Sequence, residues 1–164
     1  MAKELNATMH FDVAPDVVFA AQADARYVTW KHQNMASFDV RADVRHSGTG
    51  TVISSTRKLP AAVPAAARRF VGDAIEISEV HSWSNPARDG SRTGTLAATF
   101  PGVPMTVHGT LSLRPEGFGA VLQVAITAKS PVPLVGGKLE EIAGEQFLRA
   151  IRKEQEIAPR WFAE

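Results

Sequence analysis

The chain has 164 residues, no cysteine, and a net charge of +1 from 18 basic and 17 acidic side chains. These values exclude disulfides and cysteine metal sites, and they provide no basic excess of the kind that nucleic-acid-binding domains carry. With no apolar signal segment and no stretch near the ~18 apolar residues of a membrane span, we expect one cytoplasmic domain over residues 1–164, without a membrane span and without a nucleic-acid partner.

The first part of the chain predicts a strand followed by two short helices. Residues 4–13 alternate between apolar and polar side chains, which indicates a half-buried strand. Pro15 suits the first turn of a helix, where its missing N–H costs nothing. Asp24 suits the N-cap of a second short helix that contains Tyr27, Val28 and Trp30.

Six further strands are expected in the middle of the chain. They cover residues 38–45, 51–59, 74–83, 93–100, 105–113 and 122–128. Turn clusters rich in glycine and proline separate most of them, and short connections make neighbouring strands antiparallel. Residues 60–72 are rich in alanine and proline, and we expect a segment that covers one end of the sheet. Whether it serves as a lid or as a partner surface stays open.

A long amphipathic helix is predicted at about residues 135–162. At 100° per residue, one stripe is apolar and the opposite arc is charged, which is typical of a helix that packs on a core. The apolar stripe contains Leu139, Ala143, Phe147, Ala150, Ile151, Ile157, Ala158 and Trp161. The charged arc contains Lys138, Glu141, Glu145, Arg149, Arg152, Glu156 and Arg160.

Three features of this helix need separate explanations. Gly136 and Gly137 are expected to give backbone clearance where the chain enters the helix. Pro159 predicts a kink or break near Ala158. Glu154 lies inside the apolar stripe, so its carboxylate is expected to have a partner: an arginine, a histidine such as His81, or water in a cavity.

Together these elements predict an α+β fold. The sheet is a curved, seven-stranded antiparallel one that wraps around the long C-terminal helix, with two short helices after the first strand. One helix rarely fills such a sheet, so a ligand cavity between the two is expected.

Several short strings carry a resemblance to a known family. They are Phe11–Ala21, Leu59-Pro60, Gly94-Thr95, Gly109-Thr110-Leu111, Val132–Glu140, Glu145-Gln146, Glu154 and Arg160-Trp161. These strings resemble the bacterial DUF2505 family of the START-like, or Bet v 1-like (SRPBCC), superfamily. The resemblance implies the helix-grip fold and a cavity for a hydrophobic ligand. It implies no reaction and no catalytic residue.

The candidate site residues are those that face the predicted cavity from the fourth strand, its neighbour and the long helix. They are Ile77, Glu79, His81, Trp83, Phe100, Gln146, Phe147, Ala150 and Glu154. The five histidines show no ligand spacing, so no metal and no cofactor is expected.

We expect a binding protein, monomeric or homodimeric, for a small apolar or amphipathic molecule such as a lipid or a polyketide-like compound. The alternative is an enzyme of the aromatase, cyclase or hydratase type. In that case Glu79, His81 or Glu154 would act as general acid or base.

Overall fold

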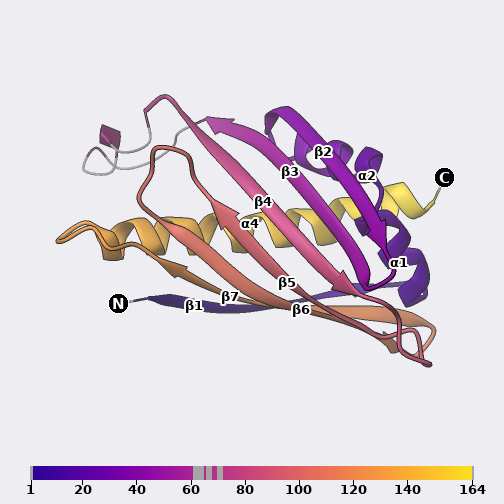
Figure 1. The fold of residues 1–164 in the computed structure, drawn as a ribbon. Helices are drawn as coiled ribbons and strands as arrows, with labels where there is room; N and C mark the ends of the chain where they lie inside the picture. The colour runs from indigo at the N-terminus through magenta and orange to yellow at the C-terminus, as the bar shows by residue number, and fades with distance from the viewer. Residues whose placement is uncertain (1, 61–64, 66–67, 70–71, 164) are drawn as a thin grey trace.

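A computed structural model describes residues 2–60, 65, 68–69 and 72–163 of the chain (Figure 1). Its elements run in the predicted order, with a curved sheet, two short helices after the first strand and a long C-terminal helix. Their bounds are β1 (Lys3–Phe11), α1 (Pro15–Gln22), α2 (Ala25–Gln33), β2 (Phe38–Ser47), β3 (Gly50–Pro60), β4 (Ala74–Ser84), β5 (Arg92–Thr99), β6 (Thr106–Glu116), β7 (Gly119–Lys129) and α4 (Gly136–Phe162).

The seven strands form one sheet in the order β1-β7-β6-β5-β4-β3-β2, and every neighbouring pair is antiparallel. Consecutive strands from β2 to β7 are neighbours because short connections join most of them. The edge strands β1 and β2 are joined through α1 and α2, which therefore lie at one end of the sheet (Figure 1). The predicted fold class is confirmed.

The two short helices begin where the sequence indicated. Pro15 is the first residue of α1, and the Asp24 side chain caps α2 by accepting a hydrogen bond of 2.8 Å from the backbone N–H of Arg26. This cap satisfies one of the N–H groups that a helix start leaves free.

α4 packs against β1 and β7 at one side of the sheet. The predicted stripe is buried or half-buried and the predicted charged arc is exposed, so both assignments are confirmed. Glu140 is also buried, and its carboxylate accepts a 2.9 Å hydrogen bond from the backbone N–H of Ser130, which ties the helix start to the end of β7. Because α4 lies over β1 and β7, the opposite half of the concave face is left partly uncovered.

A kink or a break is predicted near Ala158; the break is wrong, because α4 continues through Pro159 to Phe162, and the kink stays a prediction. Pro159 lies in the last turn, where its missing N–H removes one helical hydrogen bond. Aromatic contacts hold that turn: the rings of Trp161 and Tyr27 are 5.3 Å apart, and those of Phe162 and Phe11 are 6.1 Å apart, among others.

Glycines mark close approaches between neighbouring backbones. A Cβ on Gly109 of β6 would lie 2.4 Å from the carbonyl oxygen of Ala125, and one on Gly94 of β5 would lie 2.7 Å from that of Ser82. The prediction for the helix entry holds for Gly136, whose Cβ would meet the carbonyl oxygen of Ser130 at 3.0 Å. It is wrong for Gly137, which has nothing within 4 Å.

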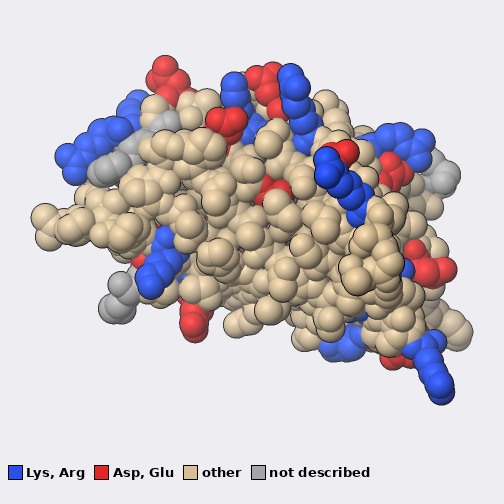
Figure 2. Space-filling model, in the orientation of Figure 1, with Lys and Arg blue, Asp and Glu red and all other residues tan. Residues whose placement is uncertain are grey.

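Two expectations are not decided by the fold. The covering segment predicted at residues 60–72 falls mostly outside the described residues, so its role stays a prediction. On the face shown in Figure 2, Lys and Arg side chains are interspersed with Asp and Glu and leave no continuous basic patch. The expected absence of a nucleic-acid partner also stays a prediction.

Candidate functional site

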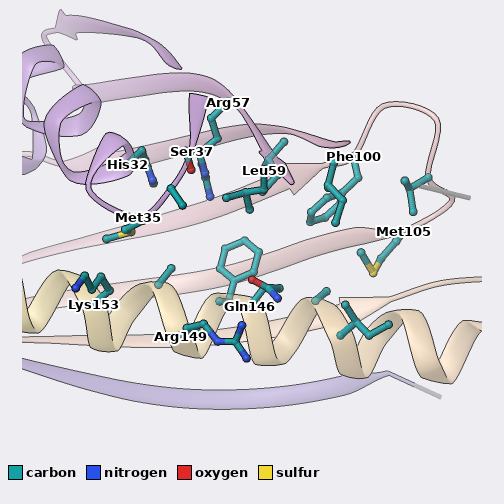
Figure 3. Close-up of a pocket in the computed structure, with 18 of the residues that line it drawn as sticks. His32, Met35, Ser37, Arg57, Leu59, Phe100, Met105, Gln146, Arg149 and Lys153 are labelled. Atoms are coloured by element: carbon teal, nitrogen blue, oxygen red, sulfur yellow. The ribbon is translucent and has the colours of Figure 1, made fainter. Parts of the chain in front are cut away.

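A cavity of about 360 Å³ lies between α4 and the half of the sheet that α4 does not cover. We call it the outer cavity (Figure 3). Its walls come from β3, β4, residues 100–105, the α2–β2 connection at residues 34–37, and one flank of α4. Its volume is at the lower end of the ~300–1,000 Å³ typical of small-molecule sites.

Most of the outer cavity wall is apolar, and the sequence pattern explains why. Leu59, Ile75 and Ile77 occupy alternate positions on β3 and β4, so their side chains point to the concave face. From α4, Leu139 and Phe147 belong to the apolar stripe of the helix. Apolar walls of this kind favour a ligand that leaves water by burying hydrophobic surface.

A smaller chamber of about 60 Å³, the inner chamber, adjoins the outer cavity. The two share five lining residues, which form the boundary between them: His32, Met35, Arg57, Phe147 and Ala150. Unlike the outer cavity, the inner chamber is lined by carboxylates, from β4 and from α4. Its charged groups are paired in two clusters.

The first cluster is centred on Glu154 of α4. Its carboxylate accepts hydrogen bonds from Lys31 Nζ at 3.0 Å, Tyr27 Oη at 2.7 Å and Gln22 Nε2 at 2.8 Å. Burial alone would raise the pKa of Glu154, but Lys31, Gln22 and Tyr27 together hold that pKa below its usual value. The carboxylate is therefore charged at neutral pH and connects α4 to both short helices.

The second cluster is centred on Glu79 of β4. One carboxylate oxygen lies 3.0 Å from Arg57 Nη1, and the other contacts His81 Nε2. Burial would raise the pKa of Glu79, but Arg57 and His81 hold it well below its usual value. Arg57 and Glu79 reach each other because β3 and β4 are paired, with Arg57 opposite Ile77 and next to Glu79 along the concave face.

His32 of α2 lies at the boundary between the two cavities. Burial, with the nearby charges of Arg57 and Lys31, lowers the pKa of His32 to about 2. Its ring is thus neutral at physiological pH, as expected for an imidazole that is out of water and close to cations.

All nine residues predicted for the site line one of the two cavities. Five line the outer cavity: Ile77, Phe100, Gln146, Phe147 and Ala150. The other four, which are Glu79, His81, Trp83 and Glu154, line the inner chamber. The candidate carboxylates and the histidine thus line the inner chamber, whereas Gln146 is the polar candidate that lines the outer cavity. That these residues bind a ligand remains a prediction.

The expectation of an arginine or histidine partner for Glu154 is wrong. Lys31, Tyr27 and Gln22 satisfy its carboxylate, and His81 pairs with Glu79 instead. The reason is positional, because α2 packs close to the C-terminal half of α4 and carries both Lys31 and Tyr27.

The residues of the site that were not predicted include Lys31, His32, Ser37 and Arg57. Two of them had a signal in the sequence. Arg57 lies in the alternating series with Ile53 and Leu59, and Lys31 is one helical turn after Tyr27 and Val28. Ser37 had none, since its position depends on the turn after α2, where Ala36 has a φ of 63°.

The model of the family "Protein of unknown function (DUF2505)" matches residues 6–162. The chain belongs to the DUF2505 family. A relative of this DUF2505 protein is the uncharacterized protein Mb0491c of Mycobacterium bovis, which is 25% identical over 129 residues, or 77% of this chain and 74% of the relative.

Three solved structures show a similar fold at low sequence identity. TTHA0849 from Thermus thermophilus has a TM-score of 0.61 at 16% sequence identity. The match covers 96% of this chain and 99% of that protein. A START superfamily protein from Mycobacterium smegmatis has a TM-score of 0.53 at 10% sequence identity. The match covers 96% of this chain and 98% of that protein. The third structure is norcoclaurine synthase from Thalictrum flavum in complex with dopamine and hydroxybenzaldehyde. Its TM-score is 0.53 at 10% sequence identity, and the match covers 98% of this chain and 88% of that protein. At these identities the likeness concerns the fold, which is START-like and Bet v 1-like.

None of the helices among the described residues is long and apolar enough to cross a membrane. Within the same residues, no group of three or more His, Asp or Glu side chains could hold a metal ion.

Proposed function

We propose that this DUF2505 protein binds one small apolar or amphipathic molecule, such as a lipid or a polyketide-like compound, in the outer cavity. The observation that carries the proposal is the cavity of about 360 Å³ with mainly apolar walls between α4 and the sheet. A ligand in the cavity would cover apolar side chains, and each Å² of apolar surface removed from water favours binding by roughly 25 cal/mol. A protein of the same fold, norcoclaurine synthase, has been solved with two small aromatic compounds bound.

A titration with the neutral dye Nile red tests this proposal. Dye fluorescence should rise with a saturable, one-site curve on the wild type. Ala150→Phe should weaken binding at least about tenfold, because Ala150 lines both cavities and the larger side chain would occupy space that the dye needs. A steric cost of about 1.4 kcal/mol corresponds to a tenfold change in Kd. Ala20→Phe is the matched control, since Ala20 is exposed on α1. Equal dye binding by Ala150→Phe and wild type would contradict the proposal.

The alternative, an enzyme with an acid or base in the cavity, has one observation in its favour and one against. The lowered pKa values of Glu79 and Glu154 make both carboxylates weak bases, whereas general catalysis works best with a pKa near the working pH. His81 remains as a candidate base, and its contact with Glu79 would orient its ring.

Small-molecule profiles distinguish the enzyme from the binding protein. Wild type and His81→Gln are each incubated with the same cell extract, and the extract is compared by mass spectrometry before and after. A compound consumed by wild type and left intact by His81→Gln would support the enzyme. Compounds retained by both proteins without chemical change would support the binding protein.

A further inference from the structure

The two ends of the outer cavity differ in polarity. Phe100 and Met105 lie at one end, beside the N-terminal half of α4 (Figure 3). His32, Ser37 and Lys153 lie toward the other end, where α2 passes into β2. A ligand with one apolar and one polar end would therefore match the cavity in a single orientation.

The charged groups of the outer cavity all have one sign. Its described lining residues include Arg57, Arg149 and Lys153 but neither Asp nor Glu. The charge of Arg57 is balanced by Glu79 at 3.0 Å, which leaves the two α4 cations to set the sign of the potential. Arg149 is exposed and Lys153 is half-buried, so solvent weakens the attraction of these two charges for an anion without changing its sign.

Arg149 and Lys153 are four residues apart, so they lie on the same flank of α4. Arg149 makes no hydrogen bond or ion pair with the part of the chain that the structure describes. Lys153 Nζ lies 3.3 Å from Glu156 Oε1 on the surface, a contact of little energetic value that a ligand could replace. Both cations are thus available to an anion.

A buried hydroxyl adds a neutral donor at the same end. Ser37 is only 8% exposed and lines the cavity. Its Oγ has no hydrogen-bond partner among the described residues. A buried polar group without a partner destabilises the protein, so an acceptor supplied by a ligand would be favourable.

From these observations we infer that the ligand is an amphiphile with a single apolar chain and an anionic head group, such as a carboxylate. The head lies near Ser37, Arg149 and Lys153, and the chain extends toward Phe100 and Met105. The volume of about 360 Å³ favours one chain over two. This inference rests on the proposed function and specifies the ligand class of the same cavity.

Competition against Nile red with three ten-carbon compounds tests the inference. The compounds are decanoate, decan-1-ol and decyltrimethylammonium, which share a chain and differ in head charge. On the wild type, decanoate should displace the dye at a concentration about fivefold lower than decan-1-ol, and the cation should be the weakest competitor. Raising the salt concentration should reduce the advantage of decanoate.

Variants assign this preference to named side chains. Joint replacement Arg149→Gln and Lys153→Gln should weaken decanoate about fivefold and leave decan-1-ol unchanged, which also shows that the cavity is intact. Ser37→Ala should weaken decanoate by a smaller factor. Arg152→Gln is the charge-matched control, because Arg152 is exposed on α4 and does not line the cavity.

Failure of the anionic head group and failure of ligand binding in the outer cavity give different results. If decan-1-ol matches decanoate on the wild type, or if the double variant binds decanoate normally, the anionic head group is contradicted while the cavity stays a ligand site. If Nile red does not bind the wild type at all, the proposed function fails, and this inference fails with it.

Discussion

Lys31 and Glu154 form an ion pair of 3.0 Å in which both side chains are less than one-tenth exposed. The pair links α2 to α4, two elements that are more than a hundred residues apart in the chain. Taking both charges out of water is costly, and the cost is offset only while each keeps its partner. The stability of the fold therefore depends more strongly on Glu154 than on a carboxylate at the surface.

Glu154→Leu should lower the free energy of unfolding by about 3–5 kcal/mol, because it leaves the Lys31 charge buried without a partner. Joint replacement of Lys31→Met and Glu154→Leu should recover only the part of that loss that comes from the unpaired charge, because Tyr27 Oη and Gln22 Nε2 stay buried without their acceptor. Urea denaturation measures both. Glu156→Gln, at an exposed position on the same helix, should change stability by no more than about 0.5 kcal/mol. A Glu154→Leu protein as stable as wild type would refute the structural role of the pair.

The buried, neutral His32 predicts a loss of stability in weak acid. Its pKa is about 2 in the folded protein and near 6.5 in the unfolded chain, so between these values the unfolded chain binds one more proton. Stability must then rise with pH across this window and fall as the pH drops below about 6.5. From pH 7 to pH 5 the contribution of His32 amounts to about 2 kcal/mol.

Urea denaturation at several pH values measures that contribution. His32→Gln should flatten the profile between pH 7 and pH 5 relative to wild type. His10→Gln, at an exposed position on β1, is the matched control. If both variants keep the slope of wild type, His32 is not the group responsible.

The cross-strand approach at Gly109 predicts that even a methyl group is too large there. Gly109→Ala should lower stability by about 1–3 kcal/mol, since its Cβ would overlap a backbone carbonyl of β7 that cannot move independently. Gly137→Ala is the matched control at an open helical position. It should be neutral or raise stability by up to about 1 kcal/mol. Thermal denaturation of the two variants gives the comparison, and equal effects would contradict the packing argument.

Most of the fold was predictable from the sequence because its elements obey simple periods. Alternation on the strands and the 3.6-residue period of α4 placed Ile77, Phe147 and the unusual Glu154 on the inner faces. Periodicity reports which face a side chain occupies, and this information was sufficient to identify inward-facing residues before their contacts were known.

Contacts and volumes were not predictable in the same way. The partner of Glu154 is Lys31 because of the way α2 docks on α4, a relation that no local period contains. Ser37 reaches the cavity because Ala36 adopts a left-handed φ of 63° after α2. The size of the outer cavity depends on the position of α4 over β1 and β7, which follows from packing of the whole domain.

Methionine methyl NMR tests ligand binding in the outer cavity most directly. The chain has four methionines, of which Met35 and Met105 line that cavity from the α2–β2 connection and from the opposite end. In a protein with ¹³C-labelled methionine methyls, titration with decanoate should shift the Met35 and Met105 signals together along one saturable curve. Their signals staying in place, while decanoate displaces Nile red, would show that the ligand binds elsewhere and would contradict the account.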